Sequence, residues 1–226
     1  MQSKQNKQQG QIKKLRSILK DAGKGNLLTG QLNLACCQQI IKKCRSFRQR
    51  IYTPFQIIHS FIKQVLDSDK SCSNAVISMA AERLNEGKKK ISINTGPYVK
   101  ARKRLPVETI HQLVNAIGKD SLQTASVSWK PYGREIKLCD GTSVQMPDTK
   151  ANRKVFPKHN NQKKNIGFPL ARIVAVMSLT TGSIIDYAID ACKGKGTGEI
   201  SLLRKILGCI EENDILVVDR LYCNFF

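Results

Sequence analysis

Two aspartates stand at the ends of apolar segments in a chain that has few acidic residues. Asp140 lies within "IKLCDGTSVQMPD", residues 136–148, and Asp219 closes "ILVVD". If each segment is an unbroken strand, Asp140 shares a face with Leu138 and Asp219 shares a face with Val217, because strand side chains alternate. A carboxylate at the tip of a buried strand is unfavourable unless it is exposed, paired or bound to a cation.

Two such aspartates on neighbouring strands predict a divalent-metal site, since Mg²⁺ takes carboxylate oxygens and keeps water and phosphate ligands besides. In a basic protein this indicates two-metal phosphodiester chemistry, in which one metal activates water or a 3′-hydroxyl and the other stabilises the leaving oxygen. Local alternatives stay open for each residue alone. Asp140-Gly141 also fits a hairpin turn, and Asp219 also fits a salt bridge to Arg220 or a strand-end cap. Asp148 in "MPDT" is expected to be a turn or cap residue.

Other motifs with possible chemistry fail on detail. The glycine-rich segment "KGKGTGE", residues 193–199, has Glu199 where a dinucleotide fingerprint needs glycine, and it lacks the Gly-Lys-Ser/Thr of a P-loop. It is expected to be a loop that opens a helix, with Glu199 favourable near the helix dipole. The eight cysteines include no C-x-x-C pair and are not spaced with the histidines as zinc ligands. Free thiols in a reducing cytoplasm are expected.

The net charge favours a polyanionic partner. Lys and Arg number 38 against 17 Asp and Glu, which gives +21 and a pI near 9.9. The first sixty residues hold twelve basic side chains and one acid. No apolar run approaches the roughly 18 residues of a spanning helix, and the first ten residues are not a secretory signal. Nucleic acid is therefore favoured over a membrane surface.

The elements that must position the aspartates change in type along the chain. Helical periodicity predicts helices within residues 1–118, including "IKKLRSILKDAG" (12–23), "TPFQIIHSFIKQVLD" (53–67) and "SCSNAVISMAAERLNEG" (71–87). Ile57, Ile58, Phe61, Ile62 and Val65 are the predicted buried stripe of the second of these. Residues 119–133 have the composition of a linker. The predicted fold is a helical N-terminal domain followed by an α/β layer.

Beyond the linker the pattern alternates. "REIKLC" and "SVQM" are predicted as paired strands, and "ARIVAVMSLTTGSIIDYAID" as a second pair with a turn at Thr181-Gly182. "GEISLLRKILGCIEEN" predicts an amphipathic helix. "DILVVDRLY" then predicts a short strand buried on both faces, because it is almost entirely apolar.

Several of these segments together resemble a known family. "CDGTSVQMPDT", "NIGFPLARIVAVMSLTTGSIIDYAID" and "EISLLRKILGCIEENDILVVDRLY" are similar, in this order, to the catalytic core of DDE transposases of bacterial insertion sequences, in the insertion-sequence-four group. "YVKARKRLP", residues 98–106, resembles a segment of that group's helical N-terminal region. The resemblance runs from about residue 95 to the end and implies a ribonuclease-H-like mixed sheet over 134–226, after a basic DNA-binding region over 1–118.

The resemblance also implies residue roles. The family's Asp-Gly-Thr motif falls on Asp140 and its Asp-Arg-x-(Tyr/Phe) motif on Asp219, with Arg220 and Tyr222 following. Asp140 and Asp219 are thus the expected catalytic and Mg²⁺-binding residues, and DNA at transposon ends is the expected partner. The expected DNA-binding residues are Lys100, Arg102, Lys103, Arg104, Lys163, Lys164 and Arg220. A homodimer and a location in the cytoplasm with the nucleoid are further expectations.

One part of the family pattern is missing from the sequence. The family's third catalytic residue is a Glu on a later helix, and no acidic residue follows Asp219 before Phe226. The sequence therefore predicts a truncated ribonuclease-H-like sheet and a transposase lineage with an incomplete catalytic site. The alternative is a non-catalytic DNA-binding protein that occupies transposon ends or inhibits an intact transposase. A basic RNA-binding module, suggested by charge alone, is disfavoured by the motifs.

Overall fold

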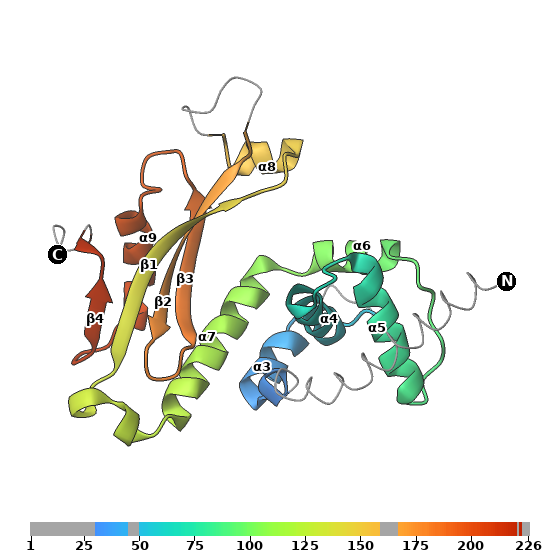
Figure 1. Ribbon diagram of the computed structural model, residues 1–226, viewed down its shortest axis with the longest axis horizontal. Helices are drawn as coiled ribbons and strands as arrows, with labels where there is room; N and C mark the ends of the chain where they lie inside the picture. Colours follow the sequence, from blue (N-terminus) through green and yellow to red (C-terminus); the bar gives the residue numbers. More distant parts are fainter. Residues whose placement is uncertain (1–29, 45–49, 159–166, 221, 223–226) are drawn as a thin grey trace, which may run out of the picture. The chain divides into compact units, whose positions relative to one another are not determined.

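A computed structural model describes residues 30–44, 50–158, 167–220 and 222, and it divides into two compact units between Ile110 and His111 (Figure 1). The first unit is helical and the second contains a four-stranded mixed sheet with helices. The predicted class, a helical region followed by an α/β layer, is confirmed at this level.

The described part of the helical unit contains α3 (Ala35–Lys42), α4 (Pro54–Leu66), α5 (Cys72–Asn85), α6 (Gly96–Arg104) and the start of α7 (Val107–Thr124). The hydroxyls of Thr53 and Ser71 accept hydrogen bonds from backbone N–H groups in the first turns of α4 and α5, as helix N-caps do. The helix predicted over residues 12–23 lies outside the described residues.

The buried stripe of α4 differs from the prediction. Ile57 and Ile58 are buried, whereas Phe61 and Val65 are exposed by 38% and 48%. Gln64 takes a buried place instead, and its side-chain oxygen accepts a hydrogen bond from the hydroxyl of Tyr98 in α6 at 2.9 Å. A buried Gln–Tyr pair thus replaces part of the expected apolar contact.

The predicted linker over 119–133 also differs. Residues 119–124 complete α7, and only the remainder forms a connection, with short 3₁₀ turns at Val127–Trp129 and Pro131–Gly133. The compact units divide between Ile110 and His111 rather than at 118. The difference arises because α7 packs on the sheet. Gly118 of α7 lies so close to the backbone of Ile184 and Ile185 that a side chain at this position would contact it.

The sheet has the order β3-β2-β1-β4. β1 (Ile136–Gln145), β2 (Leu170–Ser178) and β3 (Ile184–Ala191) form an antiparallel meander, and β4 (Ile215–Val218) pairs in parallel with β1. The predicted turn at Thr181-Gly182 is confirmed, with Gly182 at φ +67°. The prediction that "REIKLC" and "SVQM" are two paired strands is wrong, because both belong to the single strand β1.

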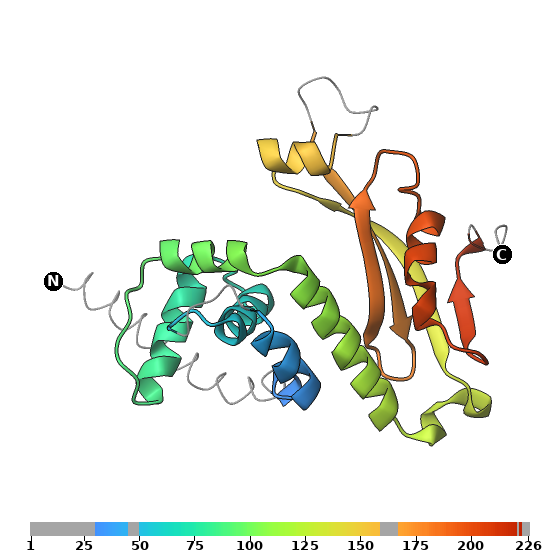
Figure 2. The same cartoon turned by 180° about the vertical axis from the view of Figure 1, so that it is seen from behind.

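Helices α8 (Lys150–Val155) and α9 (Glu199–Ile206) lie on the connections between strands. Leu202, Leu203 and Ile206 of α9 pack with Val174 and Val176 of β2 to form the core of this unit, and Figure 2 shows α9 against the sheet with its axis roughly along the strands. A 3₁₀ turn, η3 (Leu207–Cys209), leads from α9 towards β4. The helical crossover explains how β4 becomes parallel to β1.

β4 is less buried than predicted. Val217 is 46% exposed, and the other three residues of the strand are half-buried, so the prediction of a strand buried on both faces is wrong. β4 stands at the end of the sheet order, and only the side of Leu216 and Val218 packs against the α9 core. The apolar sequence of β4 therefore belongs to a strand with only one face covered by the described core.

Within the described ranges no helix is long and apolar enough to span a membrane. The seven cysteines that fall in those ranges are all free thiols.

Candidate functional site

The two predicted aspartates lie at the same end of neighbouring strands. The parallel register of β1 and β4 runs from Ile136–Ile215 to Cys139–Val218, and the next residue on each strand is Asp140 or Asp219. Neighbouring strands are about 5 Å apart, so the carboxylates leave the sheet from adjacent backbone positions. The expectation that the two aspartates sit on neighbouring strands is confirmed.

The register places Asp140 on the face away from α9. Cys139 and Val218 point to the α9 core, so Asp140, the next residue of β1, points to the opposite face, and Asp219 directly follows β4. Asp140 and Asp219 are both exposed. Exposure allows both carboxylates to reach a solvated cation.

Two of the local alternatives, the hairpin turn at Asp140 and the salt bridge at Asp219, are not seen, and a strand-end role of Asp219 stays open because this residue directly follows β4. Asp140 lies inside the continuous strand β1 rather than in a hairpin turn, and its carboxylate accepts a hydrogen bond from the N–H of Gly141 at 2.7 Å. In the described part of the chain, neither Asp140 nor Asp219 forms a salt bridge, so Asp219 is not paired with Arg220.

Asp148 behaves as expected of a turn residue. It directly precedes Thr149, the N-cap of α8, and its carboxylate accepts hydrogen bonds from Lys158 Nζ at 3.1 Å and Arg153 Nε at 2.7 Å. The hydrogen bond from Lys158, followed by that from Arg153, lowers the pKa of Asp148. Its charge is therefore already satisfied by two cations.

Glu199 connects the surroundings of the two aspartates, and its place was not predicted from the sequence. Its side chain lies against the backbone of Gly141, the residue after Asp140, where an added Cβ would come within 2.6 Å of the carboxyl carbon. The same carboxylate accepts a hydrogen bond from the hydroxyl of Tyr222 at 3.2 Å. Tyr222 in turn closes the turn after Asp219, because its N–H donates to the carbonyl of Asp219 at 2.9 Å.

Arg172 of β2 approaches Glu199 from a third side, with Nε at 3.9 Å from Oε1. Glu199 is the first residue of α9, so the expectation that it favours the helix dipole fits its position. Gly141, Glu199 and Tyr222 come from distant parts of the sequence, and no local pattern relates them.

The pKa values of the groups beneath the aspartates reflect burial. Burial raises the pKa of the Cys139 thiol to about 11, with smaller contributions from Cys209, Asp140 and Glu199. Burial also raises the pKa of the Tyr222 hydroxyl, and the nearby Cys139 and Glu199 act in the same direction. Cys139 and Tyr222 are therefore neutral near pH 7, and the charge at this end of the sheet resides on carboxylates and arginines.

The described residues contain no group of three or more His, Cys, Asp or Glu side chains arranged to hold a metal ion. Glu199 is the third acid near the pair, but it contacts Gly141, whose side of β1 faces α9. The site as described is a pair of exposed carboxylates with a hydrogen-bonded Glu–Tyr contact beneath it.

The predicted DNA-binding residues fall into three groups. Lys100, Lys103 and Arg104 are exposed on α6, and Arg220 is exposed beside Asp219. Arg102 is half-buried: its guanidinium lies 4.1 Å from the ring centre of Phe61 and donates to Gln64 at 3.3 Å. Lys163 and Lys164 lie outside the described residues. The exposed charge of α6 therefore comes from its other three basic side chains.

Replacing Gly141 with alanine tests the contact with Glu199. The new methyl group would displace the Glu199 side chain and break its hydrogen bond with Tyr222, so we expect a loss of about 1 kcal/mol in the free energy of unfolding. The measurement is urea denaturation followed by circular dichroism. In the double variant Gly141→Ala with Glu199→Ala, the losses should fall short of additivity by about 0.5 kcal/mol or more. Fully additive losses would contradict the contact.

No family model, no curated protein and no solved structure matches this chain.

Proposed function

We propose that the chain is a transposase-type DNA-binding protein in which Asp140 and Asp219 contribute to a Mg²⁺ site for phosphodiester cleavage and strand transfer. The observation that carries the proposal is the parallel register of β1 and β4, which brings the two aspartates to one end of the sheet. The proposal also rests on the sequence resemblance to DDE transposases.

The two residues fit a magnesium ion. Mg²⁺ is commonly bound through one or two carboxylates, with water and substrate phosphate as its other ligands. Asp140 and Asp219 are exposed oxygen donors on adjacent backbone positions. When bound there, a divalent cation would supply Lewis-acid activation of water or of a 3′-hydroxyl.

The chain's own residues would hold and orient this site. The N–H of Gly141 donates to Asp140 and restricts the rotation of its carboxylate, and the Glu199–Tyr222 hydrogen bond fixes the turn that follows Asp219. Arg220, next to Asp219 and exposed, is placed to contact a phosphate near the carboxylates.

The sheet is compatible with the ribonuclease-H-like fold that the resemblance implies. An antiparallel meander is followed by helix α9 and then by β4, parallel to the first strand. The net charge of +21 supports DNA as the partner, because contacts between basic side chains and phosphates dominate the affinity of such proteins.

The second candidate is a non-catalytic DNA-binding protein that occupies transposon ends. It is favoured by the position of Glu199, which is engaged by Tyr222 and lies towards α9 rather than beside the exposed pair. Both candidates predict salt-sensitive DNA binding, and only the first predicts cleavage or strand transfer.

Metal binding separates the role of the aspartates from that of the DNA-binding surface. We expect the full chain to bind Mn²⁺, used as a paramagnetic substitute for Mg²⁺, and Asp140→Asn or Asp219→Asn to weaken this binding about tenfold or more, because each removes an anionic ligand. Electron paramagnetic resonance of free Mn²⁺ measures the affinity. Asp148→Asn is the matched control, since that carboxylate is paired with Arg153 and Lys158.

Equal Mn²⁺ affinity in the wild type and in both aspartate variants would refute the metal site. Gel shifts of duplex DNA over a salt series test DNA binding by the same proteins, and retardation should fall steeply as salt rises. Metal-dependent cutting of DNA that is lost in Asp140→Asn favours the catalytic candidate, and DNA binding without cutting favours the second.

A further inference from the structure

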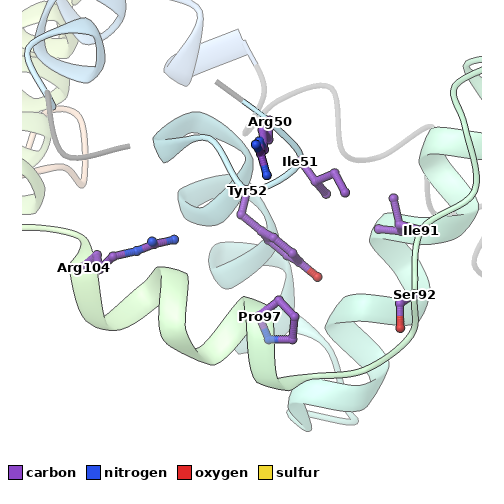
Figure 3. Close-up of a pocket in the computed structure, with 7 residues that line it drawn as sticks. All are labelled: Arg50, Ile51, Tyr52, Ile91, Ser92, Pro97 and Arg104. Carbon is purple, nitrogen blue, oxygen red and sulfur yellow. The ribbon is translucent and has the colours of Figure 1, made fainter. Parts of the chain in front are cut away.

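A pocket of about 470 Å³ lies in the helical unit, between the residues that precede α4 and the start and end of α6. Its walls differ in character. Arg50 and Arg104 come from distant parts of the chain, and Figure 3 shows Arg50 above Tyr52 and Arg104 to its left. Ile91 and Pro97 line the apolar part of the pocket together with the ring. The volume falls within the range of small-molecule pockets, roughly 300–1,000 Å³.

The aromatic wall is fixed by the core. The Tyr52 ring lies 6.2 Å from the ring of Tyr98, which is fully buried, and Tyr52 packs against the cluster of Ile57 and Ala101. A ring held in this way presents a prearranged surface to a ligand without a large loss of side-chain entropy. Burial raises the pKa of Tyr52, so the ring is neutral near pH 7.

The charged side chains that line the pocket, Arg50 and Arg104, are both basic. None of the residues that line it is acidic, and the segment that leads to Ile91 begins with Lys88, Lys89 and Lys90, all exposed. Lys88 is paired with Glu86 at 2.6 Å. A pocket lined by two guanidinium groups and by apolar and aromatic surface fits a ligand with an anionic part and a flat apolar part.

We propose that this pocket binds one nucleotide of a single DNA strand, with its phosphate at Arg50 and Arg104 and its base against Tyr52 and Pro97. Arginine forks match phosphate geometry, and bases stack on aromatic side chains with little regard to sequence. The proposal specifies single-stranded DNA as a ligand of the helical unit, and it rests on the proposed DNA-binding function. It involves neither of the aspartates and requires no metal.

The test measures fluorescence anisotropy of labelled oligothymidine and of a labelled duplex of equal length, titrated with the full chain without divalent cations. Two variants are compared with wild type: Arg50→Gln with Arg104→Gln, which removes both guanidinium groups, and Ser92→Trp, which fills the pocket and keeps its charge. The control is Lys42→Gln with Lys43→Gln. Both lysines are exposed at the end of α3, so the control removes the same charge from a surface outside the pocket. Circular dichroism confirms that each variant is folded.

We expect the double arginine variant to bind oligothymidine about tenfold or more weakly, with the salt slope reduced by roughly 0.7 for each lost phosphate contact. Ser92→Trp should weaken oligothymidine binding and leave duplex binding unchanged, and deoxythymidine monophosphate in excess should compete only with the oligothymidine. The lysine control should retain more single-strand affinity than the arginine variant.

An equal loss of oligothymidine affinity in the arginine variant and in the lysine control would show nonspecific electrostatic attraction and would contradict nucleotide binding in the pocket. An equal loss of single-strand and duplex affinity in Ser92→Trp would also contradict the proposal, because the pocket would then not distinguish an unpaired base from duplex DNA. If the wild type binds duplex but not oligothymidine, the inference fails while the proposed function stands. If the wild type binds neither, both fail.

Discussion

Replacing Lys137 with alanine is expected to lower the free energy of unfolding by about 3–5 kcal/mol, because it leaves a buried carboxylate without its cation. Lys137 in β1 is almost fully buried. Its ammonium donates to Asp214 Oδ2 at 2.6 Å and to the carbonyl of Cys209 at 2.7 Å. Asp214 immediately precedes β4, so this pair ties the start of β4 to β1. Urea denaturation of the full chain measures the change.

The double variant Lys137→Met with Asp214→Asn is the control for Lys137→Ala. Replacing both members of a buried pair with neutral groups is often close to neutral, so the double variant should recover much of the lost stability. A loss in the double variant as large as the sum of the single losses would show that the pair is not coupled. The single variant should also weaken Mn²⁺ binding, because the register of β4 determines where Asp219 lies.

Replacing Gly118 with alanine is expected to destabilise the chain by about 1–3 kcal/mol, because it overpacks a close contact. The new methyl group would lie 2.6 Å from the carbonyl oxygen of Ile184 and 3.0 Å from Cα of Ile185, and both are backbone atoms of β3. Helix propensity alone predicts the opposite sign, a gain of about 1 kcal/mol for alanine over glycine. The sign of the change in thermal or urea denaturation therefore measures how closely α7 packs on β3.

Gly208→Ala is the matched control for Gly118→Ala. Gly208 lies in η3, and a Cβ there would meet no atom within 4 Å, so its effect should stay within about 0.5 kcal/mol. Stabilisation by Gly118→Ala would contradict the close approach of α7 to β3.

The elements with strong local signals were predictable. Thr53 and Ser71 cap helices as their sequence positions indicate, and the Thr181-Gly182 turn follows from a glycine that adopts positive φ. Elements governed by tertiary packing were not. The Asp140-Gly141 pair has the composition of a hairpin turn, yet β1 continues through it because β2 pairs with its whole length and Glu199 fills the space beside Gly141.

The candidate site was predictable in its two main residues and not in their support. Asp140 and Asp219 could be placed at the ends of apolar strands because side-chain alternation and strand length are local properties. Glu199, Tyr222 and the Lys137–Asp214 pair depend on which strands become neighbours, and no residue spacing encodes that. Burial of β4 was overestimated for the same reason, since apolar composition does not indicate whether one or two faces are covered.

The two outer edges of the sheet are unequal. The start of β3 lies against Gly118 of α7, whereas among the described strands β4 has a neighbour on one side only. The side of β4 without a neighbouring strand offers backbone N–H and C=O groups for pairing, so a further strand can add to the sheet there. A fifth strand there would move Asp219 from the rim of the sheet to its interior. Because an enclosed carboxylate favours a bound cation, strand addition and cation binding would be thermodynamically linked.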